Sequence, residues 1–228
     1  MRPVVRGSIP TEGEGEDITF TKYSQARGPL IERLGPYCSY CEIRLDSALA
    51  VEHIQPKKRE YHPELELVWD NFLLACSNCN STKGDTNVVL EDYHWPDQDN
   101  TYRLLQYSEG GLVHPADDLT PEETQKAWNI IKLTGLDKRP TDIREVKDRR
   151  RDARREAWDT AQDSKADLEE CDCEQMRRQV VRSMNSFWSV WMTVFKDDPD
   201  MCRRFIEALP GTCKECFDGQ DSYKPIPR

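Results

Sequence analysis

The sequence lacks any apolar run long enough to cross a membrane. The best candidate, Phe187–Phe195, is far shorter than the roughly 20 residues that a spanning helix needs, and Arg182 and Lys196 flank it. The first residues also lack the apolar segment of a secretory signal peptide. We therefore expect a cytoplasmic protein with no membrane partner.

Positive charge is also scarce. The chain has 32 Lys and Arg against 42 Asp and Glu, which gives a net charge of −10. Proteins that hold duplex nucleic acid through electrostatics alone usually carry an excess of Lys and Arg. The composition therefore favours weak nucleic-acid binding, or delivery by a partner, over tight autonomous binding.

Cysteine, in contrast, is abundant, with nine residues in the chain. Four of them form two Cys-x-x-Cys pairs, Cys38/Cys41 and Cys76/Cys79. This pattern is typical of a closed tetrahedral zinc site with four thiolate ligands. The segment between the pairs is long enough for a hairpin. We therefore expect a structural zinc ion to tie a hairpin to the start of a helix and to supply folding free energy.

The other cysteines leave two interpretations open. They are Cys171, Cys173, Cys202, Cys213 and Cys216. The Cys-x-Cys and Cys-x-x-Cys pairs among them predict either a second zinc site that closes the C-terminal helices or free thiols. We favour free thiols, because a Cys-x-Cys pair is a weaker signal.

A further pattern lies between and beside the first two pairs. Glu52–His53 is followed by Ile-x-Pro, and two asparagines follow, Asn71 and Asn80. With the flanking cysteines, the segment Tyr37–Gly84 resembles the HNH (ββα-metal) endonuclease family, in its variant with a zinc-binding Cys-x-x-Cys pair on each flank. The acidic position differs in one respect, since Glu52 stands where Asp is more usual in the family.

The chemistry of these residue types agrees with that resemblance. Phosphodiester hydrolysis needs an activated water and neutralisation of charge on the phosphoryl oxygens. Histidine suits proton removal from water near neutral pH, and the resemblance implies that His53 is the general base. Mg²⁺ or Mn²⁺ prefers oxygen ligands, which Glu52 and Asn80 supply. The resemblance also implies that Asn71 braces the loop that carries His53, and Lys83 is expected to reach a phosphate.

The alternative is a non-catalytic zinc ribbon that binds nucleic acid or protein. It explains the four cysteines, but it does not explain His53, Asn71 and Asn80 together. The resemblance implies cleavage of DNA to 5′-phosphate and 3′-hydroxyl ends.

The predicted fold is α+β. We expect an N-terminal arm and helix in residues 1–34, a ββα-metal nuclease module in 35–95, and a mainly α-helical region in 96–228. Within that last region the patterns predict the following elements: a hairpin in 102–113, a capped helix in 120–134, a charged helix in 142–168, an apolar-striped helix in 180–195 and a short helix in 199–209.

The charged helix carries seven basic residues against three acidic ones in Arg144–Arg155. The favoured interpretation is a solvated face with ion pairs between successive turns. The functional alternative is a ridge that contacts phosphates, with Arg150 and Arg154 as the candidate residues.

An HNH core followed by a helical tail also resembles stand-alone HNH proteins of bacterial anti-phage systems, such as the Septu type. Some of these act with an ATPase that senses the phage. The resemblance therefore implies a regulatory ATPase partner and a DNA substrate. A homo-oligomer and an RNA substrate stay open.

Overall fold

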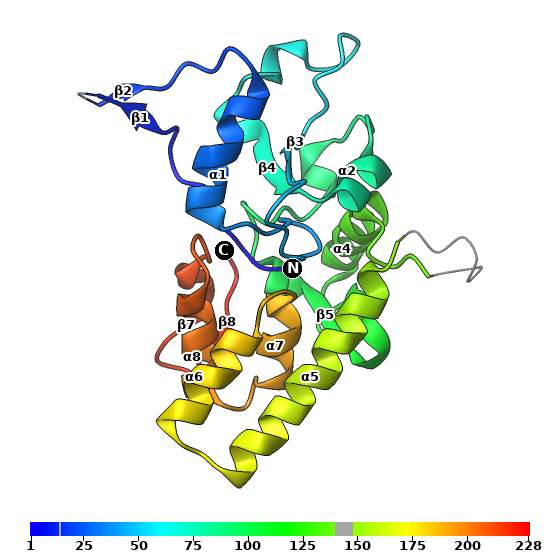
Figure 1. Cartoon of the computed structure of the whole chain (residues 1–228). Helices are drawn as coiled ribbons and strands as arrows, with labels where there is room; N and C mark the ends of the chain where they lie inside the picture. The colour runs from blue at the N-terminus through cyan, green and yellow to red at the C-terminus, as the bar shows by residue number, and fades with distance from the viewer. Residues whose placement is uncertain (14, 140–147) are drawn as a thin grey trace.

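The computed structural model describes residues 1–13, 15–139 and 148–228. Its N-terminal part begins with a projecting hairpin, β1 (Thr11–Glu12) and β2 (Glu16–Asp17) (Figure 1). The first residues are not the extended or mobile arm that we expected, because Arg2 is buried and donates hydrogen bonds to the carbonyls of Leu34 and Pro210, at 2.6 and 2.8 Å. A 3₁₀ turn, η1 (Tyr23–Ala26), leads directly into α1 (Arg27–Leu34).

The centre of the molecule is a hairpin followed by a helix. Strand β3 (Ala50–His53) pairs antiparallel with β4 (Phe72–Ala75), with His53 opposite Phe72. Helix α2 (Ser77–Lys83) follows and packs against β3. This order confirms the predicted ββα core.

A second hairpin and a capped helix follow this core. Helix α3 (Thr101–Leu104) leads into β5 (Leu105–Ser108), which pairs with β6 (Leu112–Pro115). Helix α4 (Pro121–Thr134) begins at the capping box of Thr120 and ends at Gly135, which adopts the left-handed conformation. Helix α4 confirms the sequence prediction and packs against α2. The predicted hairpin is confirmed from residue 105 onward, whereas residues 102–104, which were predicted as part of it, belong to α3.

The remaining helices differ in part from the prediction. Helix α5 (Arg150–Glu170) begins after residues 142–147, the predicted start of the charged helix, which lie outside the described residues. The predicted helix 180–195 is wrong: the structure has α6 (Glu174–Ser183) and α7 (Trp188–Val194) instead. Glu42 explains the break, because its carboxylate accepts hydrogen bonds from the backbone N–H and the hydroxyl of Ser189 at the start of α7.

The C-terminal segment closes the helical region. Helix α8 (Pro199–Ala208) matches the prediction and is capped by the side chain of Asp198. Two short strands, β7 (Phe217–Asp218) and β8 (Lys224–Pro225), form a last hairpin. Helices α6 and α8 lie beside each other at the lower end of the molecule in Figure 1.

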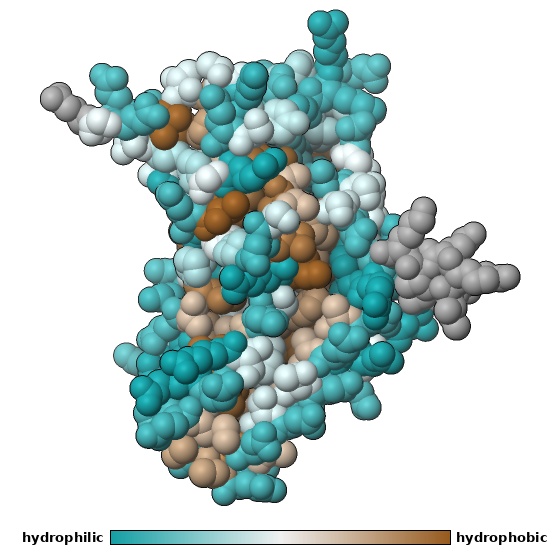
Figure 2. All heavy atoms as spheres, viewed as in Figure 1, coloured by the Kyte–Doolittle hydropathy of each residue, from teal (hydrophilic) through white to brown (hydrophobic). Residues whose placement is uncertain are grey.

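Two clusters of buried side chains hold the fold together. The first joins the ββα core to α1, the β5–β6 hairpin and α4, and the second lies among α5, α6, α7 and α8. Much of the region after residue 95 therefore packs directly on the ββα core and positions it. Hydrophilic residues cover the upper and lower parts of the face seen in Figure 2, and apolar residues show near its middle. Among the described helices, none has the length and apolarity that a membrane span requires.

Candidate active site and metal centre

Four sulfur atoms meet at the base of the ββα core. Cys38 and Cys41 come from the loop before β3, while Cys76 caps α2 and Cys79 lies in its first turn. All four are buried, and their sulfurs lie within 4.8 Å of one another. The Cys41 and Cys76 Sγ atoms are 3.6 Å apart, close to the roughly 3.8 Å that tetrahedral ligands about 2.3 Å from zinc require. The cluster therefore fits a zinc ion.

The pKa values of the cysteines couple metal binding to pH. Burial raises the pKa of the Cys41 and Cys79 thiols well above the ordinary value. A metal that binds thiolates must therefore displace protons, so metal affinity and pH are coupled.

Among the residues that the structure describes, the cysteines considered for a second zinc site do not come together. Cys171 and Cys173 lie together at the exposed turn between α5 and α6, whereas Cys213 and Cys216 are buried elsewhere. Within the described residues, only the four cysteines of the core group closely enough to hold an ion.

Arg150 joins α5 to the sulfur cluster. Its Nη1 atom donates to Cys79 Sγ at 2.8 Å and to the Thr134 carbonyl at 2.9 Å, and Nη2 donates to the Gly135 carbonyl at 3.1 Å. The side chain is only 3% exposed. Its positive charge offsets the negative charge that four thiolates leave on a zinc site.

Burial argues against both interpretations of the charged helix at Arg150 and Arg154, the favoured solvated face and the alternative phosphate-contacting ridge. Arg154 is 2% exposed and donates to the carbonyls of Gly111 and Leu136, at 3.2 and 2.7 Å. Like Arg150, it faces the interior and binds backbone carbonyls. Neither guanidinium is placed to meet a phosphate at the surface.

Lys83 is also internal, which corrects its predicted phosphate contact. It is 1% exposed, and its Nζ atom lies 2.9 Å from Glu52 Oε1 and donates to the His53 carbonyl at 2.7 Å. Burial raises the pKa of Glu52, and the charge of Lys83 opposes that shift. The pair fastens the end of β3 to α2.

The donors expected for a divalent cation, Glu52 and Asn80, lie on β3 and on α2, two elements that pack against each other. Asn80 lies three residues before Lys83 on α2, and residues at this spacing share a helix face. Lys83 engages one carboxylate oxygen of Glu52, but a carboxylate has two. One carboxylate and one amide oxygen fit a hard cation such as Mg²⁺, which keeps several of its waters.

His53 ends β3 in a pocket of aromatic rings. Its ring centroid lies 5.1 Å from that of Tyr23 and 5.2 Å from that of Phe72. Nε2 lies 3.0 Å from the Glu66 carbonyl oxygen. Because a carbonyl can only accept, Nε2 carries the proton and Nδ1 carries the free lone pair. Burial lowers the pKa of His53, which keeps the ring neutral near pH 7.

Nδ1 of His53 makes no hydrogen bond within the described part of the chain, and this atom is not fully buried. The basic nitrogen is therefore open to solvent although the residue is only 9% exposed.

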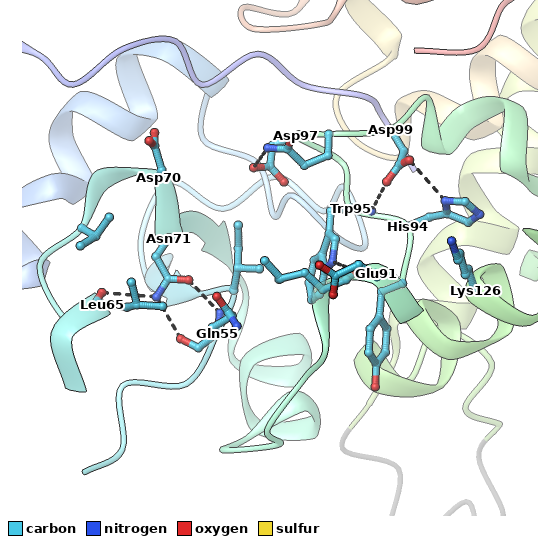
Figure 3. Close-up of a pocket in the computed structure, with 15 residues that line it drawn as sticks. Gln55, Leu65, Asp70, Asn71, Glu91, His94, Trp95, Asp97, Asp99 and Lys126 are labelled. Carbon is cyan, nitrogen blue, oxygen red and sulfur yellow. Dashed lines mark hydrogen bonds and ion pairs between the residues drawn. The ribbon is translucent and has the colours of Figure 1, made fainter. Parts of the chain in front are cut away.

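Asn71 holds the loop that follows His53. Its Oδ1 accepts from the Gln55 backbone N–H at 2.8 Å, and its Nδ2 donates to the carbonyls of Gln55 and Leu65 at 2.9 and 3.3 Å (Figure 3). The side chain thus joins the segment after β3 to the segment that carries Glu66. It contacts backbone, as a bracing residue does.

Three residues beside His53 were not identified from the sequence. Lys57 Nζ lies 3.5 Å from the centre of the Tyr23 ring and 3.1 Å from Glu66 Oε1. Tyr23 packs on His53, and Glu66 supplies the carbonyl that orients it. The only available signal was the basic run Lys57–Arg59 just after the Glu-His motif.

The chain thus has a ββα core whose hairpin and helix meet at a four-cysteine cluster, with a histidine at the end of the first strand. Comparison with known proteins agrees, because residues 38–86 match the family model described as HNH endonuclease. The chain is also similar to the Septu protein PtuB of Bacillus thuringiensis, with 41% identity over 84 residues, which is 34% of this chain and 32% of that protein. The match thus spans about a third of the relative's length.

Proposed function

We propose that this chain is an HNH endonuclease that hydrolyses phosphodiester bonds in DNA. The observation that carries the proposal is the state of His53, a neutral imidazole whose Nε2–H is held by a carbonyl and whose Nδ1 is open. A general base requires a fixed ring with an unprotonated, accessible nitrogen, whereas a histidine with a purely structural role does not.

In this mechanism, Nδ1 of His53 takes the proton of the attacking water. The Glu66 carbonyl fixes the ring's orientation and tautomer, and Asn71 keeps the flanking loop in place. The lowered pKa leaves the base unprotonated at neutral pH. We assign the phosphate contact to Lys57 in place of the buried Lys83, because the Lys57 ammonium reaches the ring of Tyr23 that packs on His53.

The two kinds of metal ion have different roles. Cys38, Cys41, Cys76 and Cys79 would hold a structural zinc ion. Glu52 and Asn80 would hold Mg²⁺ or Mn²⁺, which neutralises charge on the phosphoryl oxygens and on the leaving oxygen. The Lys83 ammonium favours the charged form of Glu52 and so opposes the rise in its pKa that burial causes.

We also propose a role in anti-phage defence with a regulatory ATPase partner. The similarity to a Septu protein supports this role. The net charge of −10 agrees with it, because such a chain gains little from its own attraction to DNA and benefits from a partner that delivers it.

The test is plasmid cleavage by wild type, His53→Ala and the control His62→Ala, each with Mg²⁺ or Mn²⁺. Each protein is assayed alone and with the proteins encoded next to it. We expect cleavage that His53→Ala abolishes and His62→Ala retains, because His62 lies in the nearby loop without a catalytic role. Nucleic-acid binding with no cleavage under any of these conditions would instead identify a non-catalytic zinc ribbon.

A further inference from the structure

A second pocket lies away from His53, where α4, α5 and the β5–β6 hairpin meet. We call it the Trp128 pocket. Its volume is about 290 Å³, and its chemically distinctive lining residues are the following: His114, Trp128, Lys132, Asp137, Arg139 and Arg151. None of these residues takes part in the proposed cleavage reaction.

Trp128 is the feature that first marks this pocket. Of the six tryptophans, four are buried and Trp158 is half-buried, but Trp128 is 37% exposed. It sits on α4, a helix that already buries Ala127, Ile130 and Ile131. The core therefore does not require this indole, and its face offers a surface on which a flat ring can stack.

The charge of the pocket is the second feature. Lys132, Arg139 and Arg151 stand against a single acidic residue, Asp137, in a chain that is acidic overall. Lys132 pairs with Asp137 and lies 5.5 Å from the Trp128 ring centre. The Nε atom of Arg151 donates to the Gly110 carbonyl at 3.1 Å, which fixes the direction of its guanidinium.

Together these features select a ligand with an aromatic ring and an anionic group. Stacking on an indole suits a nucleobase, and a fixed guanidinium suits a phosphate. The volume suits one nucleotide rather than a folded partner. We propose that the Trp128 pocket binds a nucleotide, with its base on Trp128 and its phosphate at Arg151 and Arg139.

Two sources of this nucleotide are distinguishable. One is a free nucleotide such as ATP. The other is a unit of a nucleic-acid strand, since Lys138 beside this pocket donates to Thr82 of α2 at 2.9 Å and so links it to the nuclease core. The strand source rests on the proposed nuclease function, whereas the free-nucleotide source does not.

The experiment is calorimetric titration of the full zinc-loaded chain with three probes: ATP, a ten-residue thymidine oligonucleotide and inorganic pyrophosphate. The variants are Trp128→Ala, Trp128→Phe and Arg151→Gln. The matched control is Arg178→Gln, which removes an exposed arginine from α6. Thermal melting of every variant checks the fold.

We expect Trp128→Ala and Arg151→Gln to weaken binding of ATP or of the oligonucleotide about tenfold or more, as loss of a stacked base does. Trp128→Phe and Arg178→Gln are expected to bind within about threefold of wild type. Preference for ATP identifies a free nucleotide, and preference for the oligonucleotide identifies a strand. Binding that is absent, unaffected by Trp128→Ala or equally tight for pyrophosphate overturns the proposal.

The nuclease assignment is tested separately by His53→Ala. That variant is expected to lose cleavage and to keep nucleotide binding at the Trp128 pocket. Loss of cleavage activity alone therefore leaves this proposal standing, and loss of nucleotide binding alone leaves the nuclease proposal standing.

Discussion

Replacement of Arg150 by Gln tests whether α5 is fastened to the zinc site. The change removes a buried cation that donates to one sulfur and two carbonyls, and breaking a buried ionic contact of this kind typically costs about 3 kcal/mol or more. For a chain of this length, that loss lowers the melting temperature by about 6–12 °C. Loss of the hydrogen bond to Cys79 is also expected to speed zinc release.

The matched control is Arg149→Gln, one residue earlier. Arg149 is 71% exposed, and its nearest acidic partners lie 3.9 and 4.0 Å away. Its removal is expected to shift melting by less than about 2 °C. The assays are thermal melting by circular dichroism and zinc release to a chromogenic chelator. If Arg150→Gln melts and releases zinc as Arg149→Gln does, the guanidinium does not support the metal site.

Four other predictions concern the active site and its metals. Burial lowers the pKa of His53 below its ordinary value of 6.5, so the cleavage rate should stay constant as the pH falls to 6.5 and should drop only at lower pH. Because the unfolded chain binds this proton more readily, the free energy of unfolding should also decrease as the pH falls below 6.5. Lys57→Gln removes a cation that lowers this pKa, so the acid limb should move to higher pH. Lys83→Met leaves Glu52 buried without its cation and should lower the free energy of unfolding, measured in urea, by about 3 kcal/mol or more. The double variant with Glu52→Gln should recover part of that loss. If the losses of the two single variants add up in the double variant, Lys83 and Glu52 do not interact. Elemental analysis should find about one zinc ion per chain. A content close to two zinc ions per chain would instead indicate the second zinc site.

The local signals in the sequence predicted the four-cysteine cluster and several elements correctly. Cys38, Cys41, Cys76 and Cys79 meet because Cys-x-x-Cys pairs at a loop and a helix start already have the geometry of ligands. Helix α4 was predictable because the side chain of Thr120 and the backbone freedom of Gly135 act within one turn.

The signals failed where the outcome depends on what packs against a residue. Lys83, Arg150 and Arg154 belong to charged stretches that resemble solvated or phosphate-binding faces, yet each is buried against acceptors distant in the sequence. The break before α7 depends in the same way on Glu42, far earlier in the chain. No local pattern contains such partners.

The tautomer and pKa of His53 test the proposed chemistry most directly. Nitrogen NMR of the ¹⁵N-histidine-labelled chain, with His53→Gln to assign the signals, measures both in a single pH titration. We predict a proton on Nε2, an unprotonated Nδ1 and a midpoint below 6.5. A proton on Nδ1, or a ring that is charged at pH 7, contradicts its role as the base.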